Sequence, residues 1–240
     1  MAVQREPIIK RCRYLGISPT VMGYNATFSQ KQKDAIKGYA DGTKKPVEGK
    51  DKREPVRINE RKIKADNRVD FRDPTGGKKK KLSEYGQQLK EKQKLKFIYG
   101  VQEKQFEHYF EIATKMEGKA GDNLITCLET RLDSVVFRMG LARTRREARQ
   151  LVTHSHYTVN GKKVNIPSYR VKVGDVIALR EKDRTSETFK NTVEETSDRL
   201  VPMWLEAKKD DFSATVNRLP SAEDIDYEVA THLIVELYSK

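Results

Sequence analysis

The chain has 240 residues, with 48 Lys and Arg against 35 Asp and Glu, and its formal net charge is +13. Such an excess favours a polyanionic partner, because phosphates are the commonest surface that it can neutralise. The sequence contains neither the apolar run of a signal peptide nor that of a membrane span, so we expect no membrane partner. Cys12 and Cys127 have no second Cys or His nearby at zinc-ligand spacing, and we therefore expect no metal and no cofactor.

The charge is unevenly distributed along the chain. Residues 1–94 hold 25 basic and 12 acidic residues, and residues 126–186 hold 13 and 6. Residues 187–240 reverse the balance, with 6 basic and 12 acidic residues. A solubilising coat would be spread evenly, so the split predicts different partners for different parts of the molecule.

Residues 1–82 are predicted to form a basic N-terminal extension without a core of its own. They are rich in Lys, Arg, Gly and Pro and lack a sustained period of 3.6 or 2. Such an arm becomes ordered when it meets its partner. It ends in two glycines and four adjacent cations, which are candidate RNA-binding residues: Lys78, Lys79, Lys80 and Lys81.

Residues 83–126 are predicted to form a mainly helical domain. Ser83 is a plausible cap for a helix that Gly100 stops. This helix carries three further candidate RNA-binding residues, Lys90, Lys92 and Lys94. The next segment is expected to end near Gly118 and Gly121, and its apolar residues share one helical face: Phe106, Tyr109, Phe110 and Ala113. A third helix is expected from Asp122 to Met139, with Gly140 ending it.

Residues 127–190 are predicted to form a module of helices against a small antiparallel sheet, which makes the fold class α+β. Thr144 and Glu147 have the spacing of a capping box that opens a helix. Asn160-Gly161 predicts a type I′ hairpin between strands at 157–159 and 162–166, and a further strand is expected at 176–179. Residues 187–211 are predicted to be helical and to complete the helical domain. Residues 212–240 are predicted to form a C-terminal strand, at 233–238, and a tail.

The module carries the principal candidate RNA-binding surface. Arg145, Arg146 and Arg149 are expected on one side of its second helix, opposite Ala148, Leu151 and Val152, with Arg143 at the approach to that helix. Arginine suits the task because its planar fork binds phosphate bidentately and stacks on bases. Four arginines alone are equally consistent with a solvated helix face. Cations of the predicted hairpin and the loop after it extend the surface and favour the RNA-binding interpretation: Lys162, Lys163, Arg170 and Lys172.

The residues of this module resemble a known family. Residues 128–133, 138–152 and 159–169 are similar to the bacterial-type ribosomal protein S-four family, the fourth protein of the small ribosomal subunit. Residues 81–95 and 233–240 resemble the same family. Some members have a zinc-binding cysteine group near the N-terminus, whereas Cys12 stands alone here, so the metal is not carried over. Residues 20–77 look longer than the usual family arm and different from it.

The resemblance implies a structural constituent of the small subunit that is not an enzyme and has no small-molecule substrate. It implies primary binding of ribosomal RNA in the 5′ domain, which nucleates subunit assembly. It further implies a role in translational accuracy through neighbouring small-subunit proteins, including the fifth. It also implies that the segment from Lys78 to Lys81 lies near messenger RNA at the entry channel. The expected location is a ribosome in the cytoplasm, with an organellar ribosome as the alternative.

The sequence also has features of two other classes of protein. The same module resembles one appended to RNA-modifying enzymes, but residues 1–82 do not read as a catalytic domain, and His154 and His156 lack a catalytic motif. Helices at 122–139 and 145–153 also suggest a DNA-reading helix-turn-helix. The second of these helices is dominated by arginine and has no Asn placed to read adenine, which favours phosphate and shape recognition.

Overall fold

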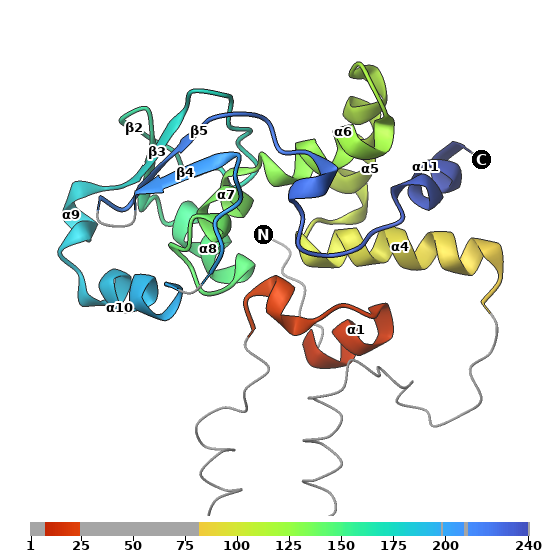
Figure 1. Cartoon of the computed structure of the whole chain (residues 1–240), viewed down its shortest axis with the longest axis horizontal. Helices are drawn as coiled ribbons and strands as arrows, with labels where there is room; N and C mark the ends of the chain where they lie inside the picture. Colours follow the sequence, from red (N-terminus) through yellow and green to blue (C-terminus); the bar gives the residue numbers. More distant parts are fainter. Residues whose placement is uncertain (1–7, 25–81, 198, 209–210, 240) are drawn as a thin grey trace, which may run out of the picture. The chain divides into compact units, whose positions relative to one another are not determined.

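The N-terminal extension contains regular structure that its composition did not predict. Helix α1 (Ile8–Leu15) is followed by the 3-10 turn η1 (Pro19–Met22) (Figure 1). The computed structural model describes residues 8–24, 82–197, 199–208 and 211–239, so Lys78, Lys79, Lys80 and Lys81 lie outside the described residues. The chain divides into a smaller unit of residues 5–20 and 24–80 and a larger unit of residues 1–4, 21–23 and 81–240. The elements described below all belong to the larger unit.

The helical part of the larger unit consists of α4 (Glu84–Ile98), α5 (Glu103–Lys115), α6 (Ala120–Glu129) and α11 (Thr231–Ser239). Ser83 caps α4 as predicted, since its Oγ accepts a hydrogen bond of 3.2 Å from the amide of Gly86. The turn after α4 contains Gly100 at a φ of 61°, a conformation that glycine adopts readily. The predicted apolar face of α5 is buried. Two predicted boundaries are wrong, because Gly121 and Asp122 lie inside the first turn of α6.

Helix α11 replaces the strand that was predicted at 233–238. It lies against α4 and α6. Ile234 is fully buried, and the ring of Tyr238 stacks on that of Phe110 with centroids 4.5 Å apart. Residues four apart share one helix face, and this packing outweighs the strand preference of the local apolar run. The helical part is therefore completed by α11, and the prediction that residues 187–211 complete it is wrong.

The predicted third helix is divided in two by a contact from elsewhere in the chain. Helix α6 ends at Glu129, and α7 (Leu132–Arg138) begins after Arg131, whose backbone is extended. Arg131 forms an isolated β-bridge with Arg170. The first amide of α7 donates a hydrogen bond of 2.9 Å to the carbonyl of Tyr169. The chain leaves the helix here because its backbone groups find these partners instead of intrahelical ones.

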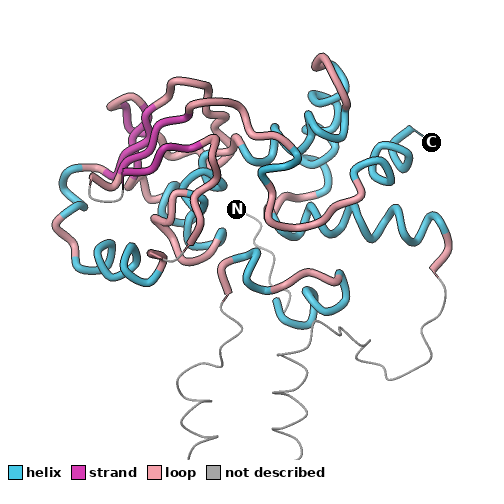
Figure 2. Tube along the Cα trace, viewed as in Figure 1, coloured by secondary structure: helices cyan, strands magenta, loops and turns pink. Residues whose placement is uncertain are grey.

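Helices α7 and α8 (Arg145–Thr153) pack against a five-stranded antiparallel sheet with the order β2-β1-β3-β5-β4 (Figures 1 and 2). The strands are β1 (Tyr157–Val159), β2 (Lys162–Lys163), β3 (Val176–Leu179), β4 (Leu205–Lys208) and β5 (Ser213–Val216). Asn160 and Gly161 have φ values of 51° and 76°, which confirms the predicted type I′ turn. Strand β2 is shorter than expected. The α+β fold class is confirmed.

Residues 187–211 are helical only in their first half. After the short helix α9 (Glu181–Arg184), α10 (Glu187–Glu195) is followed by an irregular segment and then by β4. Pro202 lacks a backbone N–H and disfavours helical backbone in the residue before it, so a helix cannot continue to Trp204. Trp204 is instead buried in the core between the sheet and the helices of the module. A second 3-10 turn, η2 (Ala222–Asp224), lies between β5 and α11.

Candidate nucleic-acid interface

Strand β2, at one edge of the sheet, carries two exposed cations. Lys162 and Lys163 form the whole of β2, and successive residues of a strand point to opposite faces of the sheet. Arg170 and Lys172, in the loop that follows, are exposed too. We call these four residues the basic edge. Lysines on an edge strand also prevent pairing with a foreign strand, so exposure alone does not define their role.

Hydrogen bonds hold the loops of the basic edge together. The Asn160 side-chain amide donates a hydrogen bond of 2.8 Å to Asp175 Oδ1, and its oxygen accepts one of 2.9 Å from the amide of Val176. Asp175 Oδ2 accepts a hydrogen bond of 2.8 Å from the backbone amide of Lys172. The β1–β2 turn and the loop before β3 are thereby joined, which places Lys172 beside the hairpin.

Three of the four candidate arginines of the second helix remain accessible. Arg143 is exposed and pairs with Glu195 of α10 through an Nε–Oε2 contact of 2.6 Å. Arg146 is partly exposed, as is Arg149, whose Nη1 donates a hydrogen bond of 2.9 Å to the carbonyl of Gly100. The capping box forms in modified form. Thr144 Oγ1 accepts from the Glu147 amide at 3.1 Å, whereas the Glu147 carboxylate accepts from the Arg143 amide at 2.7 Å.

Arg145 is buried, so its predicted position on the exposed side of the helix is wrong. Only 7 % of the residue is accessible. Its guanidinium lies between the rings of Tyr99 and Phe137, 4.7 and 4.6 Å from their centroids. Arg145, Ala148 and Val152 are the buried residues of α8, at i, i+3 and i+7. That spacing defines one helix face, so the sequence itself placed Arg145 with the apolar residues.

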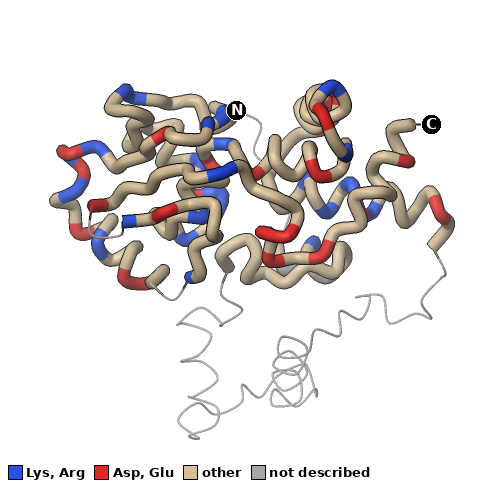
Figure 3. Tube along the Cα trace, turned by 45° about the horizontal axis from the view of Figure 1, so that its top comes forward, with Lys and Arg blue, Asp and Glu red and all other residues tan. Residues whose placement is uncertain are grey.

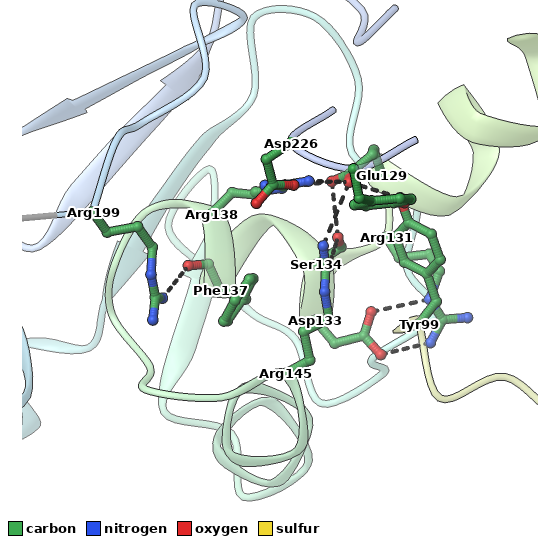
Figure 4. A network of polar contacts seen from close by, with 11 residues as sticks. Tyr99, Glu129, Arg131, Asp133, Ser134, Phe137, Arg138, Arg145, Arg199 and Asp226 are labelled. Carbon is green, nitrogen blue, oxygen red and sulfur yellow. Dashed lines mark hydrogen bonds and ion pairs between the residues drawn. The ribbon is translucent and has the colours of Figure 1, made fainter. Parts of the chain in front are cut away.

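The partners of Arg145 belong to a buried polar cluster that the sequence analysis missed (Figure 4). At its centre is Glu129, which accepts hydrogen bonds from Arg138 at 2.7 and 3.2 Å, from Ser134 at 3.0 Å and from Tyr99 at 2.7 Å. Arg145 Nη2 lies 3.5 Å from Glu129 Oε1. Burial alone would raise the pKa of Glu129, but the charges of Arg138 and Arg145 and these hydrogen bonds lower the pKa to about 2.

A further buried cation, Arg131, lies at the break between α6 and α7. Arg131 is fully buried and binds Asp133 with both arms, at 3.0 and 2.6 Å. Its remaining terminal nitrogen donates a hydrogen bond of 2.7 Å to the hydroxyl of Tyr109 on α5. A paired guanidinium of this kind stabilises the fold, because it is fully buried and each of its three nitrogens already donates to an internal acceptor.

The candidate lysines of α4 are engaged to different degrees. Lys92 Nζ lies 2.7 Å from Glu103 Oε1, and Lys94 Nζ lies 3.6 Å from Glu91 Oε2. Lys90 is partly exposed. Acidic residues gather on the segment between β5 and α11 (Figure 3), where Asp226 also pairs with the buried Arg138.

Cys12 and Cys127 are free thiols, and the described ranges hold no group of three or more His, Cys, Asp or Glu side chains suited to a metal ion. Within the same ranges, each helix is too short or too polar to cross a membrane.

Two helices against an antiparallel sheet with a basic edge define an RNA-binding module of the S4 type, and the S4 domain family matches residues 130–177. The family described as ribosomal protein S4/S9 N-terminal domain matches residues 43–129. The chain belongs to the family of the small ribosomal subunit protein uS4, which confirms the resemblance. The relative of that name from Lachnospira eligens is 45% identical over 240 residues and is matched over the full length of both chains. The relative from Clostridioides difficile is 60% identical over 165 residues, which are 69% of this chain and 79% of that protein.

Proposed function

We propose that the protein is a structural, non-catalytic constituent of the small ribosomal subunit that binds ribosomal RNA. The observation that carries this proposal is the basic edge, with four exposed cations in a module whose family binds RNA. Proteins with this module recognise shape and phosphates through such cations, and arginine adds stacking on bases. The names of the relatives support a place in the small subunit.

The proposed RNA surface combines the basic edge with Arg143, which precedes α8, and with the accessible arginines of α8, Arg146 and Arg149. Arg145 is excluded because its donors face Ser134 and Glu129. Among the lysines of α4, we assign Lys90 to this surface. Lys92 and Lys94 are less suited to bind phosphate, because their charges are already paired with carboxylates. We also propose a contact with messenger RNA for four lysines outside the described residues, and this proposal rests on the family resemblance alone: Lys78, Lys79, Lys80 and Lys81.

The finer role follows the same resemblance. We propose that the protein binds the 5′ domain of the ribosomal RNA early and so nucleates subunit assembly, and that it influences accuracy through its protein neighbours, including the fifth small-subunit protein. The acidic segment before α11 suits a protein neighbour better than RNA, because phosphates would repel Glu223, Asp224 and Asp226. The proposed location is the ribosome, cytoplasmic or organellar.

Filter binding to a 5′-domain transcript across a salt series tests the RNA surface. Changing Lys162, Lys163, Arg170 or Lys172 to Ala should weaken binding and reduce the magnitude of the salt slope by roughly 0.7 to 0.9 per lost phosphate contact. Lys104→Ala is the matched control, since this exposed lysine lies on α5, outside the proposed surface. Equal slopes for all five variants and the unchanged protein would place the binding surface elsewhere.

A further inference from the structure

The turn between α7 and α8 depends on donors from distant parts of the chain. The last carbonyls of a helix have no intrahelical donors, and the chain reverses here over residues 139–144. Tyr157 donates a hydrogen bond of 3.1 Å to the carbonyl of Leu141, and Thr196 at the end of α10 donates one to the carbonyl of Gly140. Three further carbonyls of this region are bound by a single side chain, that of Arg199.

Arg199 lies beyond the end of α10 and reaches back to the turn. Its Nη1 donates to the carbonyl oxygens of Phe137 and Ala142 at 2.9 and 2.8 Å, and its Nη2 donates to that of Arg143 at 2.8 Å. The guanidinium also stacks on the Phe137 ring, 4.3 Å from the ring centroid (Figure 4). A planar fork can satisfy several carbonyls at once, which the single ammonium of a lysine cannot do with the same geometry.

The surroundings of Arg199 are electrostatically unfavourable for a cation. Burial and the positive charges of Arg145 and Arg138 lower the pKa of Arg199 to about 10, so the side chain still carries its charge at neutral pH. The three hydrogen bonds turn its terminal nitrogens toward the protein's own backbone. Arg199 is therefore placed to support the turn and not to meet an external phosphate.

The same end of α10 also holds the side chain of Arg143. Glu195 binds its Nε at 2.6 Å and accepts a hydrogen bond from its Nη2 at 3.0 Å. Arg143 is a cation of the proposed RNA surface, and its carbonyl and guanidinium are both bound by residues that follow β3. Arg199 thus holds the backbone of Arg143, whereas Glu195 binds the guanidinium for which a phosphate of the RNA would compete.

We infer that Arg199 is a positioning residue for RNA binding, which acts by holding the α7–α8 turn so that Arg143 meets a phosphate of the RNA. This inference rests on the proposed function. It assigns to Arg199 an effect on affinity that is exerted through Arg143 and not through a contact of its own with RNA.

A double-mutant cycle on the full chain tests the inference. The variants are Arg199→Lys, Arg199→Ala, Arg143→Ala and the combination of Arg199→Lys with Arg143→Ala. Each is measured by filter binding to the 5′-domain transcript across a salt series, below the melting temperature of every variant. Arg199→Lys keeps the charge but loses the fork, and it should weaken binding by about tenfold. It should also reduce the salt slope as Arg143→Ala does, and add little once Arg143 is already Ala. Arg218→Lys is the control, because it removes another paired guanidinium, bound to Asp224 and remote in sequence from the turn.

Two results would overturn the inference. Equal weakening by Arg199→Lys in the presence and absence of Arg143 would show that Arg199 acts independently of that side chain. Wild-type affinity for Arg199→Lys, with a loss in affinity and slope for Arg199→Ala, would make Arg199 a phosphate ligand in its own right. Failure of the proposed function looks different, since the unchanged protein would then bind the transcript without salt dependence and Arg143→Ala would have no effect.

Discussion

Arg138 of α7 donates two hydrogen bonds to the carboxylate of Glu129 on α6, at 2.7 and 3.2 Å, and both side chains are almost completely buried. The pair connects the helical part to the module. Glu129→Gln leaves the buried guanidinium of Arg138 with only the exposed Asp226 as a counter-charge, and it should lower the free energy of unfolding by about 3–5 kcal/mol in urea titrations. Glu195→Gln, which breaks an exposed pair with Arg143, should change it by less than about 1 kcal/mol. Similar losses for the two variants would contradict the role assigned to burial.

The same carboxylate should make stability depend on pH in the acid range. The pKa of Glu129 is about 2 in the folded protein, against an ordinary value of 4.5. Its contribution is therefore present in full above pH 4.5 and is lost as the pH falls toward 2. Urea unfolding of the unchanged protein and of Glu129→Gln should give free energies that converge as the pH falls. A difference that stays constant between about pH 5 and about pH 3 would show that the carboxylate does not titrate in this way.

Arg143 and Arg145 should behave in opposite ways when each is changed to Ala. Arg143→Ala should leave the thermal midpoint nearly unchanged, because exposed substitutions usually alter stability by less than about 0.5 kcal/mol. It should nevertheless weaken RNA binding. Arg145→Ala should destabilise the protein by about 3 kcal/mol or more, because it removes one of the two buried cations beside Glu129 and the donor to Ser134, and leaves a cavity in the core. Thermal melts paired with filter binding separate the two effects, and an early-melting Arg143→Ala would refute the assignment.

The apolar face of α8 is centred on Val152 and not on Leu151. Val152 is fully buried, whereas Leu151 is only partly buried against the core. Val152→Ala should therefore lower the free energy of unfolding by about 2 kcal/mol. Leu151→Ala removes more atoms from a more accessible position, so its effect should be no larger. Urea unfolding of the two variants would count against this packing if Leu151→Ala proved clearly the more damaging.

Removal of the acidic partner of Arg143 should strengthen RNA binding. Glu195 occupies the guanidinium that the proposed function assigns to a phosphate, and its own charge repels RNA. Glu195→Gln should raise the affinity for the 5′-domain transcript by a few-fold at low salt, and the gain should shrink as salt screens the charges. Glu187→Gln is the control, because it removes the same charge from the exposed first turn of α10. A gain of equal size for Glu187→Gln would mean that overall charge, and not the release of Arg143, is responsible.

The elements that were predicted correctly are those whose cause is local. Ser83 caps its helix through its own side chain, and Asn160 with Gly161 turns the hairpin through their own backbone angles. The break between α6 and α7 could not be predicted in this way, since it depends on a hydrogen bond to the carbonyl of Tyr169. Helix α11 failed as a prediction for a related reason. Its apolar run has the local preference of a strand, and packing against α4 and α6 favours the helix instead.

The candidate site shows the same division. The exposure of Lys162 and Lys163 follows from a hairpin that the sequence specifies. Arg145 was misplaced although its spacing from Ala148 and Val152 already indicated the buried face, because its charge was given more weight than its periodicity. The cluster around Glu129 assembles side chains from five separate helices or loops, and no local pattern joins Glu129 to Tyr99 or Arg138 to Asp226.

The helical part is built from the two ends of the larger unit, with the whole module between them. A growing chain therefore releases α5, with Phe106 and Phe110, long before the segment that carries Tyr238. Until translation reaches α11, these aromatic side chains lack one of their stacking partners. The module can close earlier, because its last strand precedes α11. Chains that terminate before Thr231 thus lack the apolar cover that α11 supplies, and such incomplete surfaces favour aggregation.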